Sequence, residues 1–107
     1  MTWHPVIQED DLWEGELRGV TAGTVKIMLV NAGGRIRAFR DECPHKGTPL
    51  SDADFDGSTI VCPTHNWEFD ACTGCGINPG DSQLIVHEVR VEGGTVVVCD
   101  KPSPAAA

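Results

Sequence analysis

The segments Cys43-Pro44-His45 and Cys62-Pro63-Thr64-His65 decide the interpretation of this chain. Each segment supplies one thiolate and one imidazole, so together they offer two sulfur and two nitrogen donors. A [2Fe-2S] cluster with cysteines on one iron and histidines on the other needs this mixed set. A tetrahedral zinc ion can be held by the same donors. Donor chemistry alone therefore leaves two candidate metal centres.

The order of the donors separates these candidates. Structural zinc sites usually group like donors, as C-x2-4-C followed by H-x3-5-H. Here each segment holds one Cys and one His, in the order C-x-H and then C-x2-H. This arrangement suits a cluster to which both loops contribute, and it favours iron and sulfur over zinc.

At these residues the chain resembles the Rieske ferredoxin family, which carries the same C-x-H and C-x2-H signature. The resemblance implies one [2Fe-2S] Rieske cluster, with Cys43 and Cys62 on one iron and with His45 and His65 on the other. It also implies an all-β, Rieske-type fold of antiparallel sheets, in which two ligand loops form a cluster-binding subdomain at about residues 40–81.

Two further segments resemble the ferredoxins of multicomponent diiron monooxygenases, which oxidise toluene, alkenes and isoprene. Residues 62–70 match an H-x-W-x-F run after the second ligand, and residues 73–81 match a T-G-x-G-I-N-P turn. The resemblance extends over about residues 36–98. It implies that Trp67 packs beside the second ligand loop and that the loop from Gly76 to Gly80 covers the cluster. Residues 43–47, however, resemble the ferredoxins of aromatic-ring dioxygenases equally well.

The resemblance implies a non-catalytic electron carrier. It would pass single electrons from an NADH-linked flavin and iron–sulfur reductase to a terminal oxygenase, here a diiron hydrocarbon monooxygenase. The alternatives are the ferredoxin of a ring-hydroxylating dioxygenase and, in a different class, a small zinc-binding interaction module. High-potential Rieske relatives carry a disulfide where Thr48 and Thr64 stand here, and this chain has no Tyr to bond a cluster sulfur. Fewer such bonds predict a potential toward the low end of roughly −150 to +300 mV.

Length and charge agree with a carrier. The chain has 107 residues, which predicts one domain over residues 1–100 followed by a disordered tail at 101–107. Beyond the four ligands only His4 and His87 remain for the two-His, one-carboxylate iron site of an oxygenase, and both lie in expected strands, where a surface or core histidine is the favoured interpretation. The net charge of −8 argues against nucleic acid as a partner. We expect a monomer when free.

No long apolar run or charged leader is present, so we expect no membrane anchor and a cytoplasmic location, which five cysteines also fit. Cys72 and Cys75 are interpreted as loop thiols without a special role, and Cys99 as a buried small apolar residue.

Short apolar segments broken by glycine turns predict the strands. They lie at residues 3–7, 17–20, 25–30, 35–39, 59–61, 67–69, 84–91 and 95–99. The pairs Gly33-Gly34 and Gly93-Gly94 predict tight hairpins. With no long helical period, the pattern predicts an all-β sandwich or small barrel.

Overall fold

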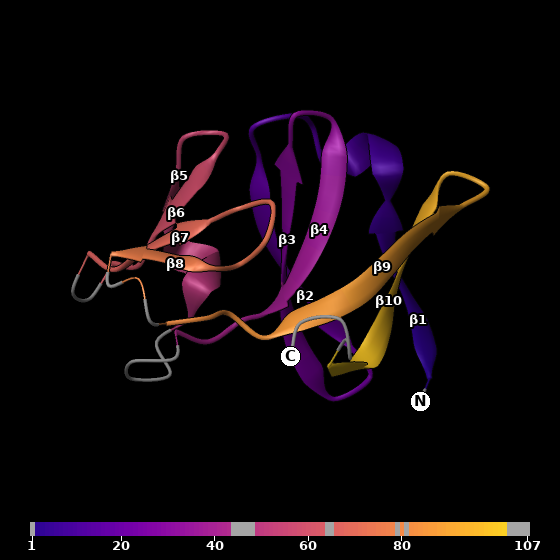
Figure 1. Ribbon diagram of the computed structural model, residues 1–107. Helices are drawn as coiled ribbons and strands as arrows, with labels where there is room; N and C mark the ends of the chain where they lie inside the picture. The colour runs from indigo at the N-terminus through magenta and orange to yellow at the C-terminus, as the bar shows by residue number, and fades with distance from the viewer. Residues whose placement is uncertain (1, 44–48, 64–65, 79, 81, 103–107) are drawn as a thin grey trace.

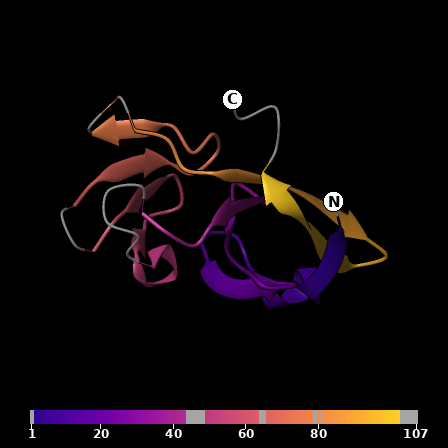
Figure 2. The same ribbon diagram turned by 90° about the horizontal axis from the view of Figure 1, so that it is seen from below.

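The computed structural model describes residues 2–43, 49–63, 66–78, 80 and 82–102. Two antiparallel sheets make up the fold, as predicted (Figure 1). The large sheet has six strands in the order β1-β10-β9-β4-β3-β2 and curls into a near-barrel, which Figure 2 shows from below. The small sheet has the order β5-β6-β7-β8 and lies beside the barrel.

The large sheet is formed by both ends of the chain. Its strands are β1 (Trp3–Gln8), β2 (Leu17–Ala22), β3 (Val25–Ala32), β4 (Arg35–Arg40), β9 (Val86–Glu92) and β10 (Thr95–Pro102). A short 3-10 helix, η1 (Glu9–Asp11), follows β1. The strands β4 and β9 are neighbours in the sheet, so the segment between them leaves the barrel and returns to it.

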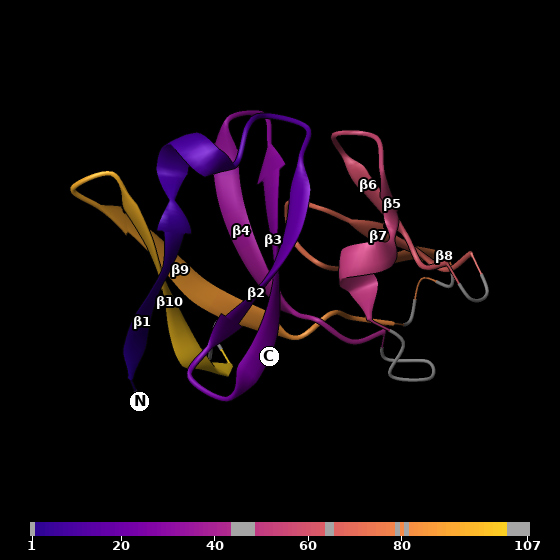
Figure 3. The same cartoon turned by 180° about the vertical axis from the view of Figure 1, so that it is seen from behind.

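That segment carries the small sheet. Its strands are β5 (Asp54–Phe55), β6 (Thr59–Val61), β7 (Glu68–Asp70) and β8 (Gly76–Asn78). A second 3-10 helix, η2 (Leu50–Asp52), precedes them and lies between the small sheet and the barrel (Figure 3).

Three sequence expectations need correction. The first concerns β5 and η2, which were not anticipated because each is only two or three residues long. Gly76–Asn78, expected to be part of a covering loop, forms strand β8 and pairs with β7. Strand β10 continues to Pro102, which pairs with His87, so the expected tail cannot begin at residue 101. Residues 103–107 lie outside the described residues.

Strand β3 contributes side chains to two hydrophobic clusters, one on each of its faces. Ile27 and Leu29 point into the barrel, where they join a cluster with residues of β4 and β10. Met28 and Val30 point the other way, into the cluster beneath the small sheet. All four are fully buried. Because side chains alternate along a strand, the unbroken apolar run at residues 27–30 is what a strand buried on both faces requires.

The glycine pairs form the predicted hairpin turns. Gly33 and Gly34 have φ values of 64° and 84°, and Gly93 and Gly94 have 59° and 83°. Two successive positive φ angles define the type I′ turn, whose twist matches that of the flanking strands. These turns therefore fix the register of β3 with β4 and of β9 with β10.

Gly74 joins the small sheet to the barrel. It has a φ of +78°, and a Cβ at this position would lie 2.8 Å from Cε1 of Phe39 and 3.1 Å from Nε2 of Gln83. Phe39, on β4, is itself fully buried in the cluster beneath the small sheet. The absence of a side chain at residue 74 thus allows the turn after β7 to approach the barrel.

Gly74→Ala is expected to destabilise the fold by about 2–4 kcal/mol, since it adds overpacking against Phe39 to the strain of a positive φ. Gly57→Ala is the matched control, because Gly57 also has a positive φ (103°) but has nothing within 4 Å of its added Cβ. The control should lose only about 1 kcal/mol. Urea unfolding measures the loss in the free energy of unfolding of each variant. Equal losses would show that the Phe39 contact is unimportant.

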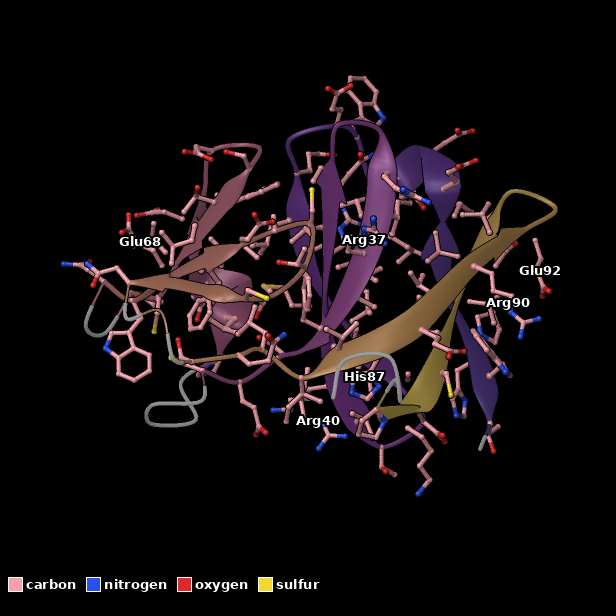
Figure 4. All side chains as sticks on the ribbon, in the orientation of Figure 1. Arg37, Arg40, Glu68, His87, Arg90 and Glu92 are labelled. Carbon is pink, nitrogen blue, oxygen red and sulfur yellow. The ribbon has the colours of Figure 1, made fainter. Side chains whose placement is uncertain are left out.

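His4 and His87 both lie in strands, as predicted, and among the described residues no group of three or more His, Cys, Asp or Glu side chains could hold a metal ion. Nε2 of His4 lies 3.1 Å from Oδ2 of Asp100. His87 is only 1% exposed, and its Nδ1–H donates to the carbonyl of Cys99 at 2.9 Å. It lies at the same end of the barrel as Arg40 (Figure 4).

The pKa of His87 lies below the ordinary value of 6.5, mainly because burial disfavours the charged imidazolium. The Cys99 carbonyl opposes this shift and the charge of Arg40 adds to it. The unfolded chain therefore binds a proton at this residue at a higher pH than the folded chain does. The contribution to stability is complete above pH 6.5 and declines as the pH falls below that value.

His87→Gln is expected to flatten the dependence of stability on pH below pH 6.5, by up to about 1.4 kcal/mol per pH unit. Urea unfolding of the variant and of the wild type between pH 8 and pH 5 measures the difference, in which all other titrating groups cancel. Parallel profiles for the two proteins would contradict this assignment.

Candidate metal centre

The two predicted cysteine ligands are buried beside the small sheet. Cys43 follows β4 by three residues, and Cys62 directly follows β6. They are 2% and 1% exposed, and both belong to the cluster that also contains Leu50, Ile60 and Phe69. The structure thus brings together two thiols that are separated by residues 44–61. The predicted histidine ligands, His45 and His65, lie outside the described residues.

The second ligand loop is closed by two backbone hydrogen bonds. The N–H of Cys62 donates to the carbonyl of Trp67 at 2.8 Å, and the N–H of Asn66 donates to the carbonyl of Cys62 at 3.0 Å. Asn66 has a φ of 57°, a left-handed conformation that Asn adopts more readily than most residues. These two bonds hold Cys62 close to Asn66 and Trp67, between the end of β6 and the start of β7.

Trp67 is partly buried and packs against the cluster that contains both cysteines. It lies beside the second ligand loop, as expected, since its carbonyl accepts the Cys62 N–H. It also fills part of the core, so it contributes both to the packing of the small sheet and to the surroundings of the second ligand loop. The apolar surroundings exclude water from the cysteine side of the centre.

The first ligand loop is held at both of its ends. The N–H of Asp41 donates to the carbonyl of Lys26 on β3 at 2.9 Å. Oδ1 of Asp41 accepts a hydrogen bond from the N–H of Ser51 at 2.6 Å. Asp41 and Ser51 enclose the segment that contains Cys43. Sequence reasoning missed this bond, because an Asp and a Ser ten positions apart carry no motif.

The other three cysteines lie as expected. Cys72 and Cys75 are exposed on the turn between β7 and β8, and Cys99 is buried on β10. The N–H of Cys72 donates to Oδ1 of Asp70 at 2.7 Å, and the N–H of Cys75 donates to Oγ1 of Thr73 at 3.2 Å. The donors in both hydrogen bonds are backbone N–H groups, so these bonds account for the shape of the turn without a contribution from the thiols.

The donors that the structure describes fit a [2Fe-2S] cluster. Two thiols buried in one apolar cluster supply the soft ligand pair that one iron of such a cluster requires. Hydrogen bonds of Asp41 and Asn66 fix the backbone near these two cysteines. This much follows from the described part of the chain, whereas the imidazole pair is predicted from the sequence alone.

The comparison with protein families agrees with this donor set. The model of the Rieske [2Fe-2S] domain matches residues 2–88. The chain therefore belongs to the Rieske [2Fe-2S] family, and the predicted cofactor, one Rieske [2Fe-2S] cluster, is the one that defines this family. The zinc alternative is set aside by this result.

Two relatives that match over most of their length are ferredoxin components. The chain is 34% identical over 96 residues to the ferredoxin component of the alkene monooxygenase system of Xanthobacter autotrophicus, covering 89% of this chain and 79% of the relative. It is 30% identical over 97 residues to the ferredoxin component of the naphthalene 1,2-dioxygenase system of Pseudomonas putida, covering 90% and 93%. Both relatives are named as ferredoxin components, so the chain is a carrier and not a catalytic subunit.

A solved structure shows the same fold. A chain in the complex of reduced oxygenase and oxidized ferredoxin in carbazole 1,9a-dioxygenase superposes with a TM-score of 0.86. The two chains are 32% identical, and the alignment covers 94% of this chain and 95% of the other. Among the described residues no helix has the length and apolar character needed to cross a membrane.

Replacing Cys72 and Cys75 together by Ser is expected to leave the visible absorption spectrum unchanged, because neither thiol belongs to the buried pair. The visible absorption of the iron–sulfur cluster and the iron content measure the outcome. Bleaching or loss of iron in the double variant would assign these thiols to the metal centre.

Proposed function

We propose that the chain is the ferredoxin component of an oxygenase system, and that it carries single electrons from an NADH-dependent reductase to a terminal oxygenase. The observation that carries this proposal is the burial of Cys43 and Cys62 in one apolar cluster, in a chain that matches ferredoxin components over most of their length. The proposed location is the cytoplasm, and the free protein is proposed to be a monomer.

In this proposal Cys43 and Cys62 bind one iron of the cluster, while His45 and His65 bind the other. When bound, the cluster supplies reversible one-electron chemistry. The buried thiolates would hold the cluster against the small sheet, and the apolar residues around them would keep water away from the cysteine side. The two histidines form the proposed edge through which electrons leave, since the cysteine side faces the core.

The proposed acceptor is a diiron monooxygenase that acts on an alkene or aromatic hydrocarbon. The T-G-C-G-I-N-P turn at residues 73–79 and the relative from an alkene monooxygenase system support this choice. The second candidate is the ferredoxin of a ring-hydroxylating dioxygenase. The relative from the naphthalene system and the solved carbazole complex favour that reading.

Electron transfer to purified oxygenases tests the proposal. The holoprotein, reduced by NADH and a reductase, is expected to support product formation by a diiron hydroxylase and to show the electron paramagnetic resonance spectrum of a reduced Rieske cluster. Its midpoint potential is expected below about +100 mV, since no Tyr and no loop disulfide stabilise the reduced cluster.

Cys62→Ser is the negative control and should lose the cluster and the transfer together. Transfer to a ring-hydroxylating dioxygenase alone would replace the first candidate by the second. A purified protein that holds the cluster but passes electrons to neither oxygenase would contradict the carrier role in both forms.

A further inference from the structure

Asp41 is attached to the barrel through its backbone. It directly follows β4, and its N–H donates to the carbonyl of Lys26 on β3 at 2.9 Å. This bond extends the pairing of β3 with β4 beyond Arg40, the last residue of β4. The backbone direction turns immediately afterwards, where the N–H of Glu42 donates to the carbonyl of Arg40 at 2.8 Å. Asp41 thus ties the backbone to the neighbouring strand β3 two residues before Cys43.

The carboxylate of Asp41 joins the two ends of the first ligand loop. Its Oδ1 accepts the N–H of Ser51 at 2.6 Å, in a partly buried position. A hydrogen bond from an amide to a carboxylate is shorter and roughly twice as strong as one between neutral groups. The segment between these two residues contains Cys43 and the proposed ligand His45, so the bond closes the loop that carries half of the ligand set.

Ser51 is held against the barrel by close packing with Gly19. A Cβ on Gly19, in strand β2, would lie 2.8 Å from Cβ of Ser51 and 3.5 Å from Oδ2 of Asp41. Only a glycine at this position allows η2 to approach β2 so closely. Figure 3 shows η2 against this side of the barrel. Strands β2 and β4 and helix η2 therefore meet at the Asp41 carboxylate.

Among the residues that the structure describes, the carboxylate of Asp41 is bonded to an amide, the N–H of Ser51, and to no cation. Among the described residues the ion pairs are His4 with Asp100 and Arg90 with Glu92. Lys26 and Arg40 line the same polar hollow as Asp41, yet neither pairs with its carboxylate. The carboxylate is placed by geometry to receive the Ser51 N–H, which is the arrangement expected of a loop closure.

We propose that Asp41 is a positioning residue of the metal centre: its carboxylate, bonded to the Ser51 amide, holds the first ligand loop closed and keeps Cys43 in the core. The inference rests on the cluster ligation in the proposed function, and it deepens that function by assigning a residue outside the ligand set. When the bond is lost, the loop opens more often, and the cluster becomes accessible to solvent and to chelators.

Asp41→Ala and Asp41→Asn form the central comparison. Asp41→Ala removes the acceptor, and the rate of cluster loss to a chelator such as EDTA is expected to rise by about tenfold, as for loss of a charged hydrogen bond. Its electron paramagnetic resonance lines should broaden, because Cys43 is held less uniquely. Asp41→Asn keeps an oxygen acceptor for the Ser51 N–H but loses its charge, so both measurements should lie between those of the wild type and those of Asp41→Ala.

Two controls separate positioning from general stability. Asp56→Ala removes a carboxylate that accepts the N–H groups of Ser58 and Thr59, at 2.9 and 2.8 Å, within the turn between β5 and β6. It should lower the melting temperature and leave the rate of cluster loss unchanged. Ser51→Ala retains the backbone N–H and should behave as wild type in both measurements.

Gly19→Ala perturbs the hydrogen bond between Asp41 and Ser51 through its donor, since the new methyl group must displace Ser51. It is expected to reproduce the faster cluster loss while Asp41 remains in place, and it keeps the test decisive should Asp41→Ala not fold. Circular dichroism reports folding of each variant.

The proposal is overturned when Asp41→Ala and Gly19→Ala both lose the cluster at the wild-type rate with an unchanged spectrum. It is also overturned when Asp56→Ala accelerates the loss equally, because the effect is then global. These measurements need only the cluster-loaded protein, so a wild type that holds its cluster but reduces no oxygenase refutes the proposed function and leaves this inference open to the same test.

Discussion

Two cysteines from separate loops must stay together in one water-free cluster, and the rest of the structure serves this constraint. Cys43 and Cys62 are buried beside Leu50, Ile60 and Phe69. A thiolate is costly to bury unless it binds a metal or accepts hydrogen bonds. The apolar packing around the two cysteines therefore favours a bound cation once both are deprotonated. We expect folding and metal binding to be coupled at this point.

The barrel supplies the rigid base on which this pair depends. Strand β3 is buried on both faces, so Ile27 and Leu29 stabilise the barrel while Met28 and Val30 support the small sheet. Phe39 on β4 adds to the contact between the barrel and the small sheet, and Gly74 allows the turn after β7 to pack closely against it. Because one strand serves two cores, the inserted sheet cannot shift relative to the barrel without cost to both.

The features that local chemistry determines were predictable from the sequence. The glycine pairs at 33–34 and 93–94 identified two hairpins, and the unbroken apolar run at 27–30 lay in a predicted strand. The donor order in the two cysteine segments identified the family. Strands β5 and β8 escaped prediction, because two or three residues carry no period and their pairing is decided by tertiary contacts. The hydrogen bond between Asp41 and Ser51 escaped it for the same reason.

The two cysteines proposed to hold the cluster do not decide which type of oxygenase the chain serves. The cysteines and their packing partners are buried, so a partner protein cannot recognise them directly. Selection between oxygenases has to act through exposed side chains near the metal centre. Among the described residues the large exposed apolar side chains are Trp13, Ile77 and Val91, and of these only Ile77 lies in the small sheet. It belongs to residues 73–79, which support the proposed diiron acceptor, so one side chain of that segment is accessible to a partner.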